Sequence, residues 1–300
     1  MKSLPASLIA ALVFCAGQGL AQDRAELELD HRVESEYVTP HTAWAKPYAL
    51  GSIRVLFFVS GRGMEPRQVM ELRQRFDIEA EMIFWTRIID STKEHWHGGD
   101  LGVERMDRLL SQKWDAFVFL DIPVTRLSSD QQVKLLQSVV NGAGLMLVGG
   151  DDPRVLKEKN KLATEPALSL PGTRYRIGQG RGLRIDKQPD IPYRPGWEVD
   201  YDVWAGQMGR GLLWAAGKAE PLVLTFQPDS LTVPRALLPG KSAVLHWHAP
   251  AGVHELTLEM NLRRSDGVGV SLPPVAVSGG SGAVPVSLPV LRQDVYTLDV

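Results

Sequence analysis

Four short, mostly apolar runs, with a helical pattern between each run and the next, constrain the fold of this chain more than any other feature. The runs are IRVLFFV (53–59), EAEMIFW (79–85), WDAFVFLD (114–121) and LMLV (145–148). Continuous apolar runs are typical of strands that are covered on both faces. Strands that alternate with helices predict a parallel α/β sheet, and right-handed crossovers make it doubly wound and flavodoxin-like.

Two helices carry clear boundary signals. The segment 128–144 begins with Ser128 and has Gln131 three residues later, which predicts a capping box, and it ends on glycine. Its expected apolar face holds Val133, Leu136, Val139 and Val140. Further on, YDVWAGQMGRGLLWAAGK (201–218) predicts a helix with Trp204, Met208, Leu212 and Ala215 on one face, preceded by a hairpin that turns at 178–180.

After residue 220 the pattern changes to alternating strands. LVLTF, SAVLHWHA, HELTLEMNL and VYTLDV are separated by proline and glycine turns, and SGGSGA (278–283) is interpreted as a flexible loop. This pattern predicts a smaller antiparallel β-sandwich, immunoglobulin-like in shape, over 221–300. Sandwiches of that type have about 100 residues. The predicted sandwich has only about 80 residues. We therefore expect that it lacks a last strand or that the chain is the front part of a longer protein.

The N-terminus predicts export. Lys2, the apolar stretch 8–17 and small residues up to Ala21 indicate a signal peptide over 1–21, followed by an extended leader over 22–50. Cys15 is the only cysteine, so the exported chain is expected to have no thiol. Lipidation of Cys15 is the minor alternative. Export without disulfides indicates a periplasmic or secreted protein.

Charge and hydropathy exclude two classes of partner. The net charge is -2 with a pI near 6.4, whereas a nucleic-acid binder usually has a basic stripe. The sequence contains no apolar run of about 18 residues, so no transmembrane segment is expected after signal cleavage.

Several segments together carry a resemblance to a known family. PYALGSIRVLFFVSG, WDAFVFLD, LLQSVVNGAGLMLVGGDD, GQGRGLRID and YDVWAGQMGRGLLWAAGK resemble the class I glutamine amidotransferase-like superfamily, over 51–220. The likeness is greatest to its exported, non-amidotransferase branches, which occur in bacterial envelope proteins and in some β-galactosidases. The family's amidotransferases use a Cys nucleophile with His and Glu, and this chain has no elbow motif for one. Glutamine amidotransferase activity is therefore not expected.

Candidate ligand-binding residues follow the predicted strands. In a doubly wound sheet, ligands bind outside the carboxyl ends of the strands. Arg62, Asp121, Asp151 and Asp152 occupy such positions and could line a polar pocket. The alternative interpretation is that the glycine-rich ends only form tight turns and that these charges are solvated.

The stretch EHWHGGD (94–100) raises a metal hypothesis. His95 and His97 are two residues apart, so they would share one side of an extended segment and could bind zinc with a third ligand from elsewhere. The alternative is a surface loop that is anchored by Trp96. Neither a cofactor nor a catalytic residue set is predicted.

These observations favour a non-catalytic binding or interaction module of the bacterial envelope, with an unknown protein or carbohydrate partner. The alternative is a metal-assisted hydrolase, related to carbohydrate, that uses His95 and His97. A third possibility is a structural module whose sandwich docks to another domain or chain.

Overall fold

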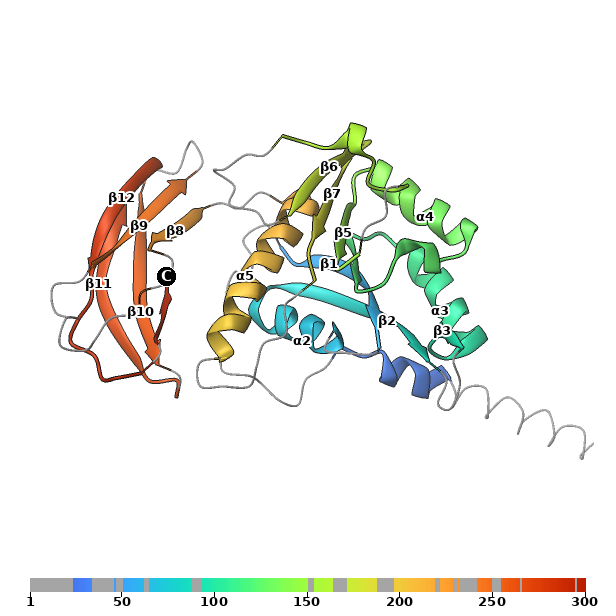
Figure 1. The fold of residues 1–300 in the computed structure, drawn as a ribbon, viewed down its shortest axis with the longest axis horizontal. Helices are drawn as coiled ribbons and strands as arrows, with labels where there is room; N and C mark the ends of the chain where they lie inside the picture. The colour runs from blue at the N-terminus through green and yellow to red at the C-terminus, as the bar shows by residue number, and fades with distance from the viewer. Residues whose placement is uncertain are drawn as a thin grey trace, which may run out of the picture.

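The computed structural model describes residues 24–33, 46, 51–61, 65–87, 93–150, 154–163, 172–187, 197–218, 222–228, 231, 242–249, 255–264, 266–294 and 296–300. Two regions follow one another along the chain, an α/β region and a region of antiparallel strands (Figure 1). The predicted signal peptide, with Cys15, lies outside the described residues.

The α/β region is built on a mixed seven-stranded sheet in the order β3-β2-β1-β4-β5-β7-β6. Its strands are β1 (Ile53–Ser60), β2 (Ile78–Arg87), β3 (Glu94–Trp96), β4 (Ala116–Leu120), β5 (Gly144–Val148), β6 (Thr173–Ile177) and β7 (Gly180–Ile185). β2, β1, β4, β5 and β7 run parallel to their neighbours, and β3 and β6 are antiparallel edges. The expected parallel α/β sheet is thus present, and β3 is an edge strand that the sequence pattern did not predict.

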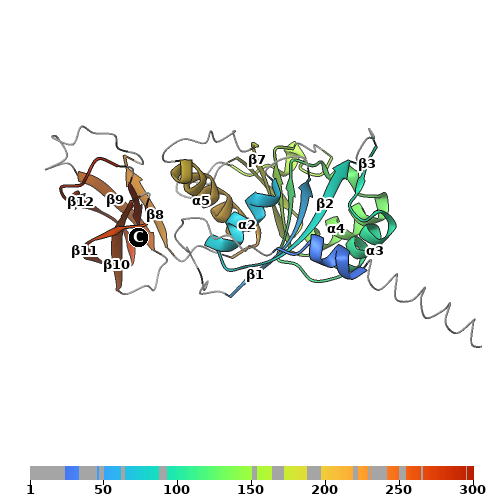
Figure 2. The ribbon, with the colours of Figure 1, turned by 90° about the horizontal axis from the view of Figure 1, so that it is seen from below.

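Helices cover both faces of this sheet (Figure 2). α2 (Glu65–Arg75) and α5 (Trp197–Ala215) pack on one face, and α3 (Gly99–Leu110) and α4 (Ser129–Val140) on the other. Because successive side chains of a strand point to opposite faces, β1 supplies both cores. Val55 and Phe57 contact the α2/α5 side, whereas Leu56 and Phe58 contact the α3/α4 side. All four are 0% exposed, which explains why β1 reads as a continuous apolar run.

α5 packs closely because it carries glycine at its contact with the end of α2. A Cβ atom at Gly209 would lie 1.9 Å from the ring Cζ of Phe76, so only glycine fits there without a shift. The predicted inner face of this helix is confirmed, since Trp204, Met208 and Leu212 are buried.

The second region consists of two three-stranded antiparallel sheets, in the orders β11-β10-β13 and β12-β9-β8. The strands are β8 (Val223–Gln227), β9 (Ser242–Ala249), β10 (Leu256–Arg264), β11 (Gly269–Val277), β12 (Gly280–Ser287) and β13 (Tyr296–Asp299). Leu245 of β9, Met260 of β10 and Val286 of β12 belong to one buried cluster, so the two sheets share a core. This arrangement is a small β-sandwich.

The structure confirms one expectation about α4 and corrects another. The capping box of α4 is present, with Gln131 N–H donating to Ser128 Oγ and Ser128 N–H to Gln131 Oε1. The predicted apolar face of α4 is wrong in part, because Val133 is 66% and Val140 42% exposed. Val139 is buried as expected and Leu136 is partly buried, while Leu135, which was not on the predicted face, is fully buried in the core on the α3 side of the sheet.

Two segments differ from the expected loop and leader. Residues 280–283 of the expected loop belong to β12, which pairs with β9 along its whole length. Cross-strand hydrogen bonds therefore order a segment that composition alone marks as flexible. Residues 24–30 of the expected extended leader form a helix that packs on α3, where Glu28 accepts a hydrogen bond from Arg105 Nε at 2.8 Å.

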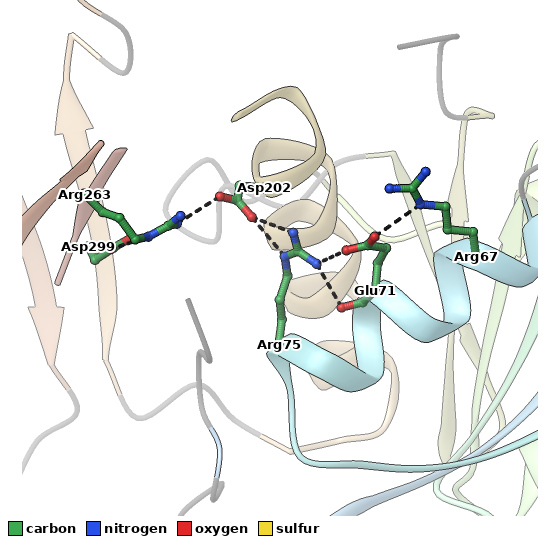
Figure 3. Close-up of polar contacts among 6 residues, drawn as sticks. All are labelled: Arg67, Glu71, Arg75, Asp202, Arg263 and Asp299. Atoms are coloured by element: carbon green, nitrogen blue, oxygen red, sulfur yellow. Dashed lines mark hydrogen bonds and ion pairs between the residues drawn. The ribbon is translucent and has the colours of Figure 1, made fainter. Parts of the chain in front are cut away.

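A chain of charged side chains joins the two regions (Figure 3). It runs from α2 through α5 to β10 and β13, and its signs alternate; we call it the ionic chain. Its members are Arg67, Glu71, Arg75, Asp202, Arg263 and Asp299.

Asp202 is the link between the regions. Its Oδ1 accepts hydrogen bonds from Arg75 Nε at 3.0 Å and Nη2 at 2.7 Å. Its Oδ2 lies 3.3 Å from Arg263 Nη2, which belongs to the sandwich. The side chain of Arg75 is 1% exposed and that of Asp202 is 5% exposed, so these charges are paired inside the protein.

None of the described helices is long and apolar enough to cross a membrane.

Candidate functional site

A cavity of about 180 Å³ lies at the carboxyl ends of the central parallel strands. β2 and β4 flank β1 on opposite sides, so the order of the strands reverses between β1 and β4. This is the place where open α/β sheets bind their ligands. Polar, charged and aromatic side chains form most of the lining: Ser60, Glu65, Trp85, Glu94, Asp121, Arg126 and Lys187.

Two carboxylates of the cavity share one ammonium group. Lys187 Nζ lies 2.6 Å from Asp121 Oδ2 and 3.3 Å from Glu65 Oε1. Asp121 follows β4, Lys187 follows β7 and Glu65 begins α2, so three separate elements supply the cluster. We call Glu65 and Asp121 the carboxylate pair. The hydrogen bond to Asp121 raises the pKa of Lys187, partly offset by burial, with further increases from the charge of Asp121 and from Glu65.

Glu65 is an unusual member of this pair because it is buried. The residue is 4% exposed, and its Oε2 atom is closed to solvent and has no hydrogen-bond partner among the described residues. Its place in the first turn of α2 is favourable, since the helix dipole attracts negative charge there. A buried carboxylate oxygen without a donor nevertheless costs about 1–3 kcal/mol or more. Such an atom beside a cavity points to a ligand that completes it.

Asp121 is held in an uncommon backbone conformation. Its φ is 53°, and among the described residues it is the one non-glycine residue with positive φ. Aspartate tolerates this left-handed region better than most residues, but the conformation still costs roughly 1 kcal/mol or more. The Asp121 N–H donates to Val148 O at 2.9 Å, which ties this turn to the end of β5. Backbone strain of this kind collects at functional sites.

A second wall of the cavity, formed by Trp85, Glu94 and Arg126, is a closed polar cluster. Glu94 Oε2 accepts hydrogen bonds from Arg126 Nη2 at 2.9 Å and from Trp85 Nε1 at 3.2 Å. The Arg126 guanidinium lies 4.9 Å from the centroid of the Trp85 ring, and Trp96 packs against the same ring at 75°. The charges on this wall are therefore matched, and the Arg126 guanidinium already covers one face of the Trp85 indole.

The structure places one of the four predicted ligand-binding residues in the cavity. Asp121 is there, whereas Arg62, Asp151 and Asp152 lie outside the described residues. Glu65 and Lys187 were missed. Glu65 follows the first strand by five residues, in a stretch that was interpreted as the loop before a helix, whereas the structure begins α2 there. Lys187 follows a hairpin that was not placed in the parallel sheet. The parallel pairing of β7 with β5 is the fact that brings Lys187 to this edge.

The predicted metal ligands lie on the edge of the sheet that β3 forms. His95 is on β3 and His97 follows it, and the buried Trp96 anchors the segment as expected. His97 Nε2 lies 3.8 Å from Asp30 Oδ2, and the Nδ1 atoms of both rings are buried without a described partner. Among the described residues, no group of three or more His, Cys, Asp or Glu side chains is placed to hold a metal ion.

A third histidine, at the end of the N-terminal helix, packs against His97. His31 is 1% exposed, and its ring centroid lies 5.1 Å from that of His97. Burial lowers the pKa of His31 to about 4, with further lowering by the charges of Arg105 and His97, against an opposing effect of its hydrogen bond to Leu27 O. The imidazole is thus neutral at pH 7, which suits its buried place.

Neither a family model nor a curated protein matches this sequence. The function has to be argued from the cavity and its charges.

Proposed function

We propose that this chain is a non-catalytic binding module of the bacterial envelope, and that it binds a small polar ligand in the cavity at the carboxyl ends of β1 and β4. The observation that carries the proposal is the buried Glu65 carboxylate, whose Oε2 atom lacks a partner among the described residues beside a cavity at the strand-order reversal. A site that is built to receive a ligand accounts for this cost, whereas solvated turn charges do not.

The scaffold that we propose is flavodoxin-like and resembles the glutamine amidotransferase-like superfamily. The parallel strands in the order β2-β1-β4-β5-β7 support the first point, since they correspond to the order 2-1-3-4-5 of that fold. Export is proposed from the N-terminal pattern of the sequence, and the immunoglobulin-like nature of the sandwich from its two packed antiparallel sheets.

A binding role also agrees with the hydrogen bonds of the described histidines. His248 Nδ1 lies 2.7 Å from Ser281 Oγ, which superficially resembles a nucleophile and its base. These two residues are a directly opposed cross-strand pair of the sandwich, and His248 is exposed. They belong to a different region from the cavity, so the pair is better explained as a surface contact of the sheet.

The test combines binding and activity. The purified chain is screened by thermal shift against small polar molecules, and by hydrolysis of an ester, amide and glycoside panel. We expect a ligand that raises the melting temperature of the wild type but not of Asp121→Asn, and no hydrolysis. Hydrolysis that Asp121→Asn abolishes would overturn the non-catalytic role, and a screen without a single site-dependent ligand would overturn the binding role.

A second candidate is a metal-assisted hydrolase at His95 and His97. The observation in its favour is that both Nδ1 atoms are buried without a described partner, as free ligand atoms would be. It predicts stoichiometric zinc in the purified protein and its loss in His97→Ala. Metal analysis that finds no zinc bound after incubation with zinc salt removes this candidate.

A further inference from the structure

The charges of the cavity also indicate which class of ligand it takes, and this step rests on the proposed binding role. We propose that the ligand is a small organic cation, with an amine or guanidine head group that is held by Glu65 and Asp121. In this proposal Lys187 occupies the cation position in the free protein and is displaced by the ligand.

The first argument is the balance of charge on the two walls. On one wall Glu94 is matched by Arg126 and by the indole N–H of Trp85. On the other wall Glu65 and Asp121 face a single ammonium among the described residues. Counted over the residues that the structure describes, the surplus on that wall is one negative charge, and an anionic ligand would increase it.

The second argument is that the hydrogen bonding of the Glu65 carboxylate is incomplete. Lys187 contacts Oε1 only, and Oε2 is left without a described donor. An ammonium is a compact point charge, whereas a guanidinium presents parallel N–H donors that fit both oxygens of a carboxylate. A ligand head group with several N–H donors can therefore complete Glu65 as Lys187 does not.

The third argument is the difference in solvent exposure between Lys187 and Glu65. The side chain of Lys187 is 53% exposed, whereas that of Glu65 is 5% exposed. Lysine has a flexible four-carbon stem and a strongly hydrated head, so it can leave the carboxylates for water at small cost.

Size and aromatic contacts narrow the class further. A volume of about 180 Å³ is below the ~300–1,000 Å³ of drug-sized sites, so the cavity fits a small molecule or a head group. Sugar rings usually stack on an open aromatic face, but Arg126 already covers the Trp85 ring. The carboxylate pair is thus the main recognition element.

The experiment uses the full purified chain and two probes, ethylammonium chloride and methylguanidinium chloride, at millimolar concentration. Sodium chloride keeps the ionic strength constant, and sodium phosphate and glucose are the anionic and neutral comparisons. Binding is measured by calorimetry and by thermal shift. The variants are Lys187→Met, Glu65→Gln and Asp121→Asn, with the exposed Glu158→Gln as a matched control.

We expect Lys187→Met to bind at least one of the cations at least 10-fold more tightly than the wild type does, because the internal competitor is gone. Glu65→Gln and Asp121→Asn should bind it at least 10-fold more weakly, and Glu158→Gln should match the wild type. If Glu65→Gln does not fold, the gain in Lys187→Met still decides the question. If Lys187→Met binds both cations no more tightly than the wild type does, the proposal that a cationic ligand displaces Lys187 is overturned.

Two further outcomes separate this inference from the proposed function. Binding of phosphate or glucose that Asp121→Asn abolishes, without binding of either cation, would overturn the cationic class and leave the binding role intact. Absence of binding by every probe, in both the wild type and Lys187→Met, would overturn the cationic class. If the wider screen of polar molecules also finds nothing, the binding role fails with it.

Discussion

The ionic chain and the carboxylate pair are both arranged along α2, yet they treat buried charge in opposite ways. At the end of α2, Arg75 lies between Glu71 and Asp202, and the signs alternate into the sandwich. At the start of α2, Glu65 and Asp121 share one half-exposed Lys187. Alternating partners make buried charge tolerable, whereas a surplus is costly. The comparison teaches that the incompletely paired cluster, and not the larger one, is the better candidate for function.

The largest expected effect tests the ionic chain. Arg75→Met leaves Glu71 and Asp202 buried without their shared cation, so we expect a loss of about 3–5 kcal/mol in the free energy of unfolding. Urea denaturation measures it. The control is Arg67→Met, at the partly exposed end of the chain, which should cost less than about 1 kcal/mol. Equal losses in both variants would show that burial does not set the energies here.

His31 extends the comparison to a buried titratable group that is neutral at pH 7. The pKa of His31 is about 4 in the folded protein against 6.5 for the free side chain, so the unfolded chain binds more protons between these values. Stability is complete above pH 6.5 and is lost as the pH falls toward 4. We expect about 2 kcal/mol of loss from this residue between pH 7 and pH 5.

The measurement is urea unfolding at the two pH values, and His31→Leu should lose that part of the pH dependence. His248→Gln, at an exposed histidine, should keep the pH dependence of the wild type. If the free energy of unfolding of His31→Leu depends on pH as that of the wild type does, His31 is not the source of the pH dependence.

Backbone strain at the carboxylate pair gives the next effect. Asp121→Gly relieves the positive φ, whereas Asp121→Ala keeps a Cβ in the left-handed region, and both remove the charge. We expect the glycine variant to be more stable than the alanine variant by about 1–2 kcal/mol, by thermal or urea unfolding. An alanine variant that is as stable as the glycine variant would indicate that this turn relaxes to negative φ.

The smallest effect belongs to the cation of the pair. Lys187→Met should lower the free energy of unfolding by about 1 kcal/mol, well below the loss in Arg75→Met, because Asp121 and the ammonium are partly open to water and only Glu65 is left buried without its described cation. Chemical denaturation at neutral pH checks this. A loss as large as that of Arg75→Met would make Lys187 a structural partner and would remove the contrast between the two clusters.

Some features of the fold could be predicted from the sequence because they depend on neighbours along the chain. The capping box of α4 needs only Ser128 and Gln131 at the right spacing, and both hydrogen bonds form. The apolar runs of the central strands likewise identify a sheet that is covered on both faces. The inner face of α4 was less accessible, because Val133 and Leu135 are equally apolar and only packing against α3 buries the second.

The candidate site was predictable only in part, for a similar reason. Asp121 was found because it directly follows a strand in the expected sheet. Glu65 and Lys187 carry no local signal of function, since a glutamate at a helix start and a lysine after a hairpin are ordinary features. Their role comes from the parallel pairing of β7 with β5, which carries Lys187 to the cavity.

By itself, the sequence determined the alternation of strands and helices, the capping signals and the change to antiparallel strands after residue 220. These follow from side-chain periodicity and from local hydrogen bonds. Only the tertiary structure decided that Glu65, Asp121 and Lys187 meet, and that Asp202 joins α2 to the sandwich. Contacts between residues 61 to 127 positions apart depend on the order of strands and on the packing of helices, which no single segment encodes.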